Sequence, residues 1–257
     1  VERDQGETSM LDHTGGYLKY RATPDVTFYI GDVRPGIGVG TLYARQTRSA
    51  LGSPVSRANG IGKLGTVSSD ENGALRGVAA RTTFRNLSIL ALYARSTWDA
   101  TIQDSLATLR LSGQHATENG IAGKDALGEI TKLLIARVGT KDTSIGVTLS
   151  RSAFTHLLDL NGIQGRAHTH AAVEVNLRLG SGHVFGEIVR SQSTASESQQ
   201  RALSAVGAVR FGSRTQRLTI LGRRLEPEYV GIRSAPPAAY GGNNEQGIGI
   251  STEMRRS

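Results

Sequence analysis

The sequence predicts an all-β fold, an antiparallel up-and-down transmembrane β-barrel, and three observations lead to this prediction. Apolar and polar residues alternate with a period of two, most clearly where polar side chains separate Val173, Val175, Leu177 and Leu179, which is the pattern of a half-buried strand. Tight turns on one side and long connections on the other alternate along the chain, as a membrane barrel requires. Several strands reach about 9 to 11 residues, which is the length of a tilted membrane-spanning strand.

About eleven strands follow from this pattern, and most are joined into hairpins by a tight turn. They are expected at residues 17–22, 26–32, 75–84, 87–95, 128–138, 144–150, 173–179, 183–190, 203–211, 216–224 and 248–254. The long connections are expected at residues 34–72, 97–127, 152–166, 191–200 and 225–244. Because single-chain bacterial barrels close with an even number of strands, residues 1–257 are expected to be a single β-barrel domain that is part of a longer barrel.

Composition excludes several classes of protein. The 257 residues contain no cysteine, which excludes disulfide frameworks, thiol nucleophiles and cysteine-ligated zinc. No run of about 18 apolar residues is present to form a membrane-spanning helix, whereas the alternating strands of a β-barrel never build such a run. Aromatic residues make up only 5% of the chain, with Trp98 the single tryptophan, so strong aromatic girdles are not expected.

Positive charge is the main chemical signal, with 30 Lys and Arg against 22 Asp and Glu and a formal net charge of +8. Five arginines fall on expected strands, where a polar barrel lumen would place them: Arg178, Arg190, Arg210, Arg217 and Arg223. Rings of arginine in a pore favour anions, so small anionic solutes are expected partners. In the alternative, lumen arginines pair with Glu129, Glu174 and Glu187 in a structural network that fills the barrel.

Two other motifs suggest binding sites. The string Pro-Gly-Ile-Gly-Val-Gly at residues 35–40 fits a strand end that runs into a glycine-rich loop, because it lacks the spacing and the following helix of a dinucleotide-binding loop. With residues 59–62 it could instead form DNA-binding hairpins that present backbone amides to phosphate. His168 and His170 share one face of a strand, with His183 across the next turn, but no carboxylate completes a metal site. Lumen or loop histidines are therefore expected.

Nothing in the sequence argues for catalysis or for a cofactor. No G-x-S-x-G nucleophile elbow is present. Asp70 and Glu71 offer oxygen ligands for a hard cation, yet their loop lacks the repeated acidic spacing of a calcium site. The prediction is a non-enzyme with no cofactor and no resident metal.

Short motifs in family order resemble one known group of proteins. Ser69, Asp70, Glu71 and Asn72 form a loop that leads into a strand with Arg76 and Gly77; Gly31-Asp32 is followed by Gly36-x-Gly38; Gly113-x-His115-x-Thr117 is followed by Glu118; and Asp99-Ala100 follows an expected strand. This order resembles the Gram-negative outer-membrane β-barrel proteins named helix-hairpin-helix domain-containing proteins. The matches cover about residues 15–150, while Pro35 and Ile37 depart from the family pattern. The resemblance implies a barrel in the cell outer membrane, with the helix-hairpin-helix domain preceding this chain.

The expected function is passive. The sequence and the resemblance together predict an outer-membrane β-barrel protein, porin-like or anchoring, in contact with outer-membrane lipid. The alternative is a soluble basic β domain that binds a polyanion, either nucleic acid or an acidic glycan, and DNA contact belongs only to that alternative. Stacking aromatics, which a nucleic-acid groove would normally add, are scarce.

Overall fold

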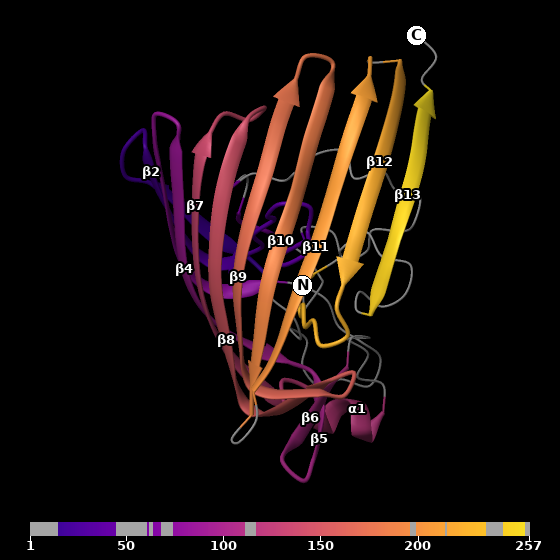
Figure 1. Ribbon diagram of the computed structural model, residues 1–257. Helices are drawn as coiled ribbons and strands as arrows, with labels where there is room; N and C mark the ends of the chain where they lie inside the picture. The colour runs from indigo at the N-terminus through magenta and orange to yellow at the C-terminus, as the bar shows by residue number, and fades with distance from the viewer. Residues whose placement is uncertain are drawn as a thin grey trace.

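The computed structural model describes residues 15–44, 61, 64–67, 74–110, 117–195, 199–213, 215–234 and 244–254. In this part of the chain one large β-sheet dominates, and its strands run up and down side by side (Figure 1). The only described helix is α1, a short segment at Glu118–Ala122.

Eleven strands form the main part of the sheet. They lie side by side in the order in which they occur along the chain, and each is antiparallel to its neighbours. They are β1 (Tyr17–Arg21), β2 (Val26–Val33), β3 (Leu75–Phe84), β4 (Leu87–Trp98), β7 (Leu127–Gly139), β8 (Ser144–Leu160), β9 (Ile163–Leu179), β10 (Gly182–Thr194), β11 (Gln199–Gly212), β12 (Gln216–Leu225) and β13 (Glu245–Met254). The predicted all-β, antiparallel, up-and-down arrangement is confirmed. No pairing among the described residues joins β1 to β13, so the sheet is open and its closure into a barrel stays a prediction.

The predicted connection at residues 152–166 is wrong. Strand β8 continues to Leu160 and β9 begins at Ile163, so only the turn Asn161-Gly162 separates them. Both turn residues have positive φ, 57° and 85°, which is the backbone of the hairpin turn that Asn-Gly favours. A register shift between Ala153 and Leu158 interrupts the alternation of β8. Because of this bulge, the sequence of β8 does not alternate with a period of two over its whole length.

Two other predicted connections contain more structure than expected. Residues 97–127 include β5 (Ala100–Gln103), β6 (Leu106–Leu109) and α1, which lie together below the main sheet (Figure 1). Strand β6 also pairs in parallel with the end of β8. Residues 191–200 are shorter as a connection than predicted, because β10 runs to Thr194 and β11 begins at Gln199.

Residues 34–44 and 226–234 fold back onto one face of the sheet, which is called the inner face from here on. Ile37 and Tyr43 are buried in one cluster with Leu133 of β7 and Val189 of β10. Tyr229, from the second segment, belongs to the same cluster. The two segments also touch, since the backbone N–H of Ala44 donates to the carbonyl of Arg233 at 2.9 Å. The inner face is therefore covered by the chain itself.

Candidate functional site

The outer face of the sheet is apolar, whereas the inner face buries polar as well as apolar side chains, and β8 shows the contrast most clearly. Ser144, Thr148 and Ser150 are buried on the inner face, whereas Val147 and Leu149 between them are exposed on the outer face. A soluble antiparallel sheet has the reverse arrangement, with apolar side chains packed and polar side chains in water. The surface of this sheet is thus the apolar side.

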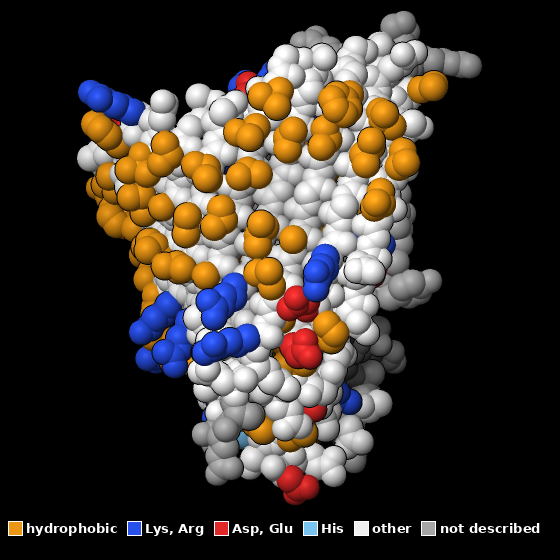
Figure 2. Space-filling view, in the orientation of Figure 1, with side chains coloured by type: hydrophobic (Ala, Val, Ile, Leu, Met, Phe, Trp, Pro, Cys, Tyr) orange, Lys and Arg blue, Asp and Glu red, His pale blue; other side chains and the backbone are white. Residues whose placement is uncertain are grey.

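Exposed large hydrophobic side chains continue across the outer face from β1 to β13. This apolar belt consists of Leu18, Tyr20, Phe28, Ile30, Val78, Tyr93, Leu134, Val138, Ile145, Val147, Leu149, Val173, Leu177, Ile188, Leu203, Phe211, Leu218, Ile220, Ile248, Ile250 and Met254. Figure 2 shows them as a broad band over the upper part of the sheet, with Lys and Arg side chains below it. Soluble monomers rarely expose continuous apolar patches beyond roughly a few hundred Å², so the apolar belt marks a surface that contacts something apolar.

The carboxylate of Glu129 is fully buried on the inner face and joins β7 to the segment 226–234. It accepts a hydrogen bond from Trp98 Nε1 at 2.6 Å and one from the Thr131 hydroxyl at 2.7 Å. Arg233 approaches it to 2.7 Å in an ion pair, and the same guanidinium lies 4.4 Å from the centre of the Trp98 ring. Glu129 is therefore a structural centre, with its charge compensated by a residue from a distant connection.

Glu187 of β10 holds the segment 34–44 in a comparable way. One oxygen of its buried carboxylate accepts hydrogen bonds from the backbone N–H of Val39 at 3.1 Å and of Thr41 at 3.0 Å. Gly38 has a φ of 52°, and a Cβ there would lie 2.6 Å from that carboxylate oxygen, so this close approach requires glycine. The glycine-rich string does present backbone amides to an acceptor, but the acceptor is the carboxyl oxygen of a side chain of the same protein.

Tyr229 fastens the two inner segments to each other. Its hydroxyl donates a hydrogen bond to the carbonyl of Thr41. Burial, followed by the nearby Glu187 carboxylate, raises the pKa of Tyr229 well above its ordinary value. The phenol therefore stays neutral at physiological pH and remains a hydrogen-bond donor.

Glu129, Glu174 and Glu187 are all buried on the inner face, but their partners are not the arginines that the sequence suggested. Glu174 of β9 lies 3.6 Å from Arg137 of β7, and Glu129 is paired with Arg233. Neither arginine was among the five candidates. Glu187 bonds to backbone amides instead.

Four of the five candidate arginines lie on the inner side of their strands, near the sheet ends. Arg178 pairs with Asp142 at 3.6 Å and Arg217 with Glu253 at 3.8 Å, while Arg223 forms an ion pair with Glu245. Arg210 is 3.0 Å from the ring nitrogen Nδ1 of His183. Among the described residues, these four arginines therefore take part in ion pairs or hydrogen bonds with neighbouring side chains.

Arg190 departs from the expectation, because it is exposed on the outer face. Its cross-strand partners are Ala171 and Leu203, which are also exposed. The neighbouring residues Ile188 and Val189 are both apolar although they point to opposite faces, so the sequence alone does not fix the orientation of this strand.

The histidines occupy two separate places. His168 and His170 do share the inner face, where His168 Nδ1 contacts the Ser193 hydroxyl and His170 Nε2 the carbonyl of Val230, each at 2.8 Å. His183 lies near the tight turns and bonds to Asn176 at 2.5 Å. In the described part of the chain no three His, Asp or Glu side chains form a metal-binding group.

Two segments that carry the family resemblance are paired in the structure, and the sequence did not predict this contact. In the pairing of β2 with β3, Gly31 faces Gly77 and Asp32 faces Arg76. Arg76 Nε donates to Asp32 Oδ1 at 2.8 Å, and the same carboxylate accepts from the backbone N–H of Gly16 at 2.7 Å. The pair closes the end of β2 and β3.

Other residues of the resemblance are less informative. Ser69, Asp70, Glu71, Asn72 and His115 lie outside the described residues, as do residues 59–60 of the hypothetical DNA-binding hairpins. Glu118 begins α1, whose first turn is capped by the Thr117 hydroxyl accepting from the N–H of Gly120 at 3.1 Å.

Comparison with known proteins does not assign this chain to a family. Neither the models of known protein families nor the curated protein sequences contain a match to this chain. Within the described ranges, no helix combines the length and the apolar character needed to cross a bilayer.

Proposed function

We propose that the protein is an outer-membrane β-barrel protein with an anchoring role, whose filled interior distinguishes it from an open porin and which has no catalytic role. The observation that carries the proposal is the apolar outer face of the sheet, which is exposed on every strand of its main part while the inner face buries many polar side chains. The interior contacts support the anchoring role over the porin-like one, because Glu129 and Glu187 fix two chain segments across the inner face.

The apolar belt is unfavourable in water and favourable in a bilayer. Burying a large apolar side chain is favourable by about 1.5–3 kcal/mol relative to its exposure in water. The belt exposes such side chains on every strand of the main part of the sheet from β1 to β13. In a bilayer these side chains contact acyl chains, while the ladder of the sheet satisfies the backbone N–H and C=O groups. Closure at the edges β1 and β13 is part of the proposal.

Cell fractionation tests the proposal directly. We expect the full-length protein in the outer-membrane fraction, released by detergent, with a heat-dependent change of mobility on a denaturing gel because a closed barrel resists unfolding at room temperature. A freely soluble protein whose mobility does not change with heating would contradict the proposal and favour the basic β domain that binds a polyanion.

A single substitution in the apolar belt gives a quantitative test. Val147→Lys, opposite Ala136 and Val173 in the middle of the exposed apolar stretch of β8, should destabilise the folded protein in bilayers by about 2–4 kcal/mol, the cost of a lysine near the membrane midplane. The measurement is the free energy of unfolding from vesicles in urea. Thr101→Lys, an equally exposed position on β5 below the sheet, is the matched control and should change it by less than about 0.5 kcal/mol. Equal effects of the two lysines would show that the outer face contacts water.

A further inference from the structure

The structure assigns to the outer face a binding site for one phosphate-headed membrane lipid. We propose that the lipid phosphate lies at Lys132 and Arg151 and that its acyl chain lies in the adjoining apolar groove. This inference rests on the proposed function and names the chemistry of a partner for one part of the apolar belt.

The groove crosses the outer face from β1 to β9 and has a volume of about 1080 Å³. Its floor is low where Ala80 of β3 and Ala91 of β4 face each other as cross-strand partners. Larger side chains stand on both sides, with Phe28 next to Ala80 and Leu134 next to Ala91. Small residues between large ones leave a hollow with apolar walls, which suits an acyl chain.

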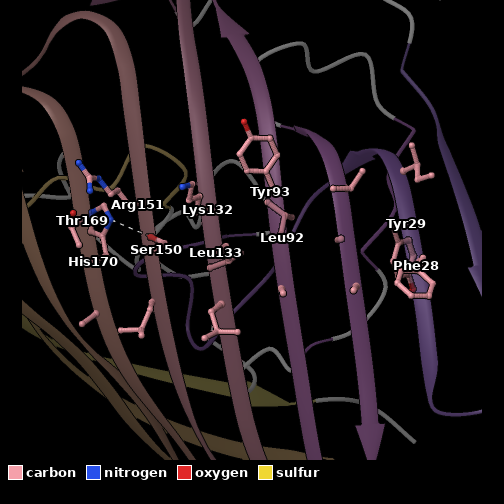
Figure 3. Close-up of a pocket in the computed structure, with 18 of the residues that line it drawn as sticks. Phe28, Tyr29, Leu92, Tyr93, Lys132, Leu133, Ser150, Arg151, Thr169 and His170 are labelled. Atoms are coloured by element: carbon pink, nitrogen blue, oxygen red, sulfur yellow. Dashed lines mark hydrogen bonds between the residues drawn. The ribbon is translucent and has the colours of Figure 1, made fainter.

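Two cations lie side by side at the end of this groove nearer the long connections. Lys132 of β7 and Arg151 of β8 are direct cross-strand partners, and both side chains are exposed on the outer face. Figure 3 shows them on neighbouring strands, with Tyr93 of β4 next to Lys132. Neither cation has an ion-pair partner among the described residues.

Such a pair is unfavourable in the protein alone. Like charges directly opposite each other on a sheet repel, and a phosphate placed between them would replace that repulsion by charge-assisted hydrogen bonds. Tyr93 completes a polar rim, because its hydroxyl accepts a hydrogen bond from Arg95 at 3.0 Å. The groove thus has an apolar body and a cationic end, the complement of a lipid with an anionic head.

The level of this pair matches the border of the apolar belt. Other exposed cations continue along the same border at Arg190, Arg201 and Arg224, and Figure 2 shows Lys and Arg side chains gathered below the apolar side chains. Arg201 and Arg224 differ from the pair, because they contact Gln199 at 2.9 Å and Glu226 at 3.6 Å. They lie outside the groove and provide a control with the same change of charge.

The test is native mass spectrometry of the detergent-extracted full-length protein with added phosphatidylglycerol or, separately, a diacylglycerol with the same acyl chains and no phosphate. We expect one phosphatidylglycerol to be retained in preference to the diacylglycerol, and K132Q/R151Q should weaken its binding about thirtyfold because two cations at the headgroup are lost. Ala91→Phe, which fills the groove and keeps the charges, should weaken it comparably. R201Q/R224Q should leave binding within about twofold, since these cations are outside the site. Inorganic phosphate added in excess should not displace the lipid.

Each other outcome overturns the inference in a recognisable way. Equal binding of the two lipids, or no effect of K132Q/R151Q, removes the phosphate site. If K132Q/R151Q weakens binding and Ala91→Phe does not, the cations bind an anion but the groove holds no acyl chain. Displacement of the lipid by inorganic phosphate would lead to the same conclusion. An equal loss in R201Q/R224Q shows general attraction along the border. Failure of the proposed function is distinguished by fractionation, because the protein would then be soluble without detergent whatever lipid it retains.

Discussion

Arg233→Ala is expected to lower the free energy of unfolding by about 3–5 kcal/mol, because it leaves the buried carboxylate of Glu129 without a compensating charge. The side chains of Arg233 and Glu129 are only 8% and 0% exposed, and their nearest atoms are 2.7 Å apart. The substitution also removes the guanidinium from the face of Trp98. The measurement is equilibrium unfolding in urea with the protein in detergent micelles, followed by tryptophan fluorescence at Trp98.

Two controls separate the buried charge from a general effect of losing an arginine. Arg178→Ala removes an ion pair of which both side chains are about half exposed, and such pairs contribute at most about 1 kcal/mol. The double variant Glu129→Gln, Arg233→Met removes both charges and should be more stable than Arg233→Ala alone, since the two effects are coupled. If Arg233→Ala costs no more than Arg178→Ala, the role given to Glu129 is wrong.

Glu187→Ala is expected to release residues 36–43 from the inner face and to destabilise the protein by about 2–4 kcal/mol. The substitution leaves the buried N–H groups of Val39 and Thr41 without their acceptor, and each unsatisfied buried group costs about 1–3 kcal/mol. Loss of a buried carboxyl group, which is costly to desolvate, offsets part of this cost. Hydrogen exchange measured by mass spectrometry should show faster exchange in peptides that cover residues 36–43.

Glu187→Gln is the matched variant, because its side-chain oxygen can still accept from both amides. We expect it to keep most of the protection from exchange that Glu187→Ala loses. Exchange at residues 226–234 provides a second readout, since Tyr229 donates to the carbonyl of Thr41 and should loosen with the first segment. Unchanged exchange in both peptides of Glu187→Ala would mean that apolar packing alone holds the interior.

Much of the sheet could be predicted from the sequence because membrane-type strands alternate. Strand β13, where Ile248 and Ile250 are exposed and every second residue is partly buried, follows period two throughout. The lower half of the β8–β9 hairpin was missed because the bulge between Ala153 and Leu158 breaks that period, although Asn161-Gly162 was a local signal for the turn. Arg190 was placed on the wrong face because apolar residues on both faces of β10 leave its orientation open.

For the inner face, the sequence predicted the type of interaction but not which residues interact. A network of arginines and glutamates that fills the lumen was one of two alternatives, and the three glutamates were named. Their partners were not, because Arg233 is separated from Glu129 by 104 residues and lies in a connection with no period. The hydrogen bonds from the Val39 and Thr41 amides to Glu187 could not be predicted either, because every residue type except proline has the same backbone N–H group.

The β8–β9 hairpin is longer than the hydrocarbon core of a bilayer requires. Each strand has 17 residues, which is about 56 Å at a rise of about 3.3 Å per residue, whereas about 9 to 11 residues cross the hydrocarbon core. The surplus carries β6 and a separate small core of Trp98, Phe154 and Leu158. Outer-membrane barrels have their long connections on the extracellular side, and in that orientation this end stands outside the lipid. Antibodies raised against the β5–β6 turn should therefore label intact cells.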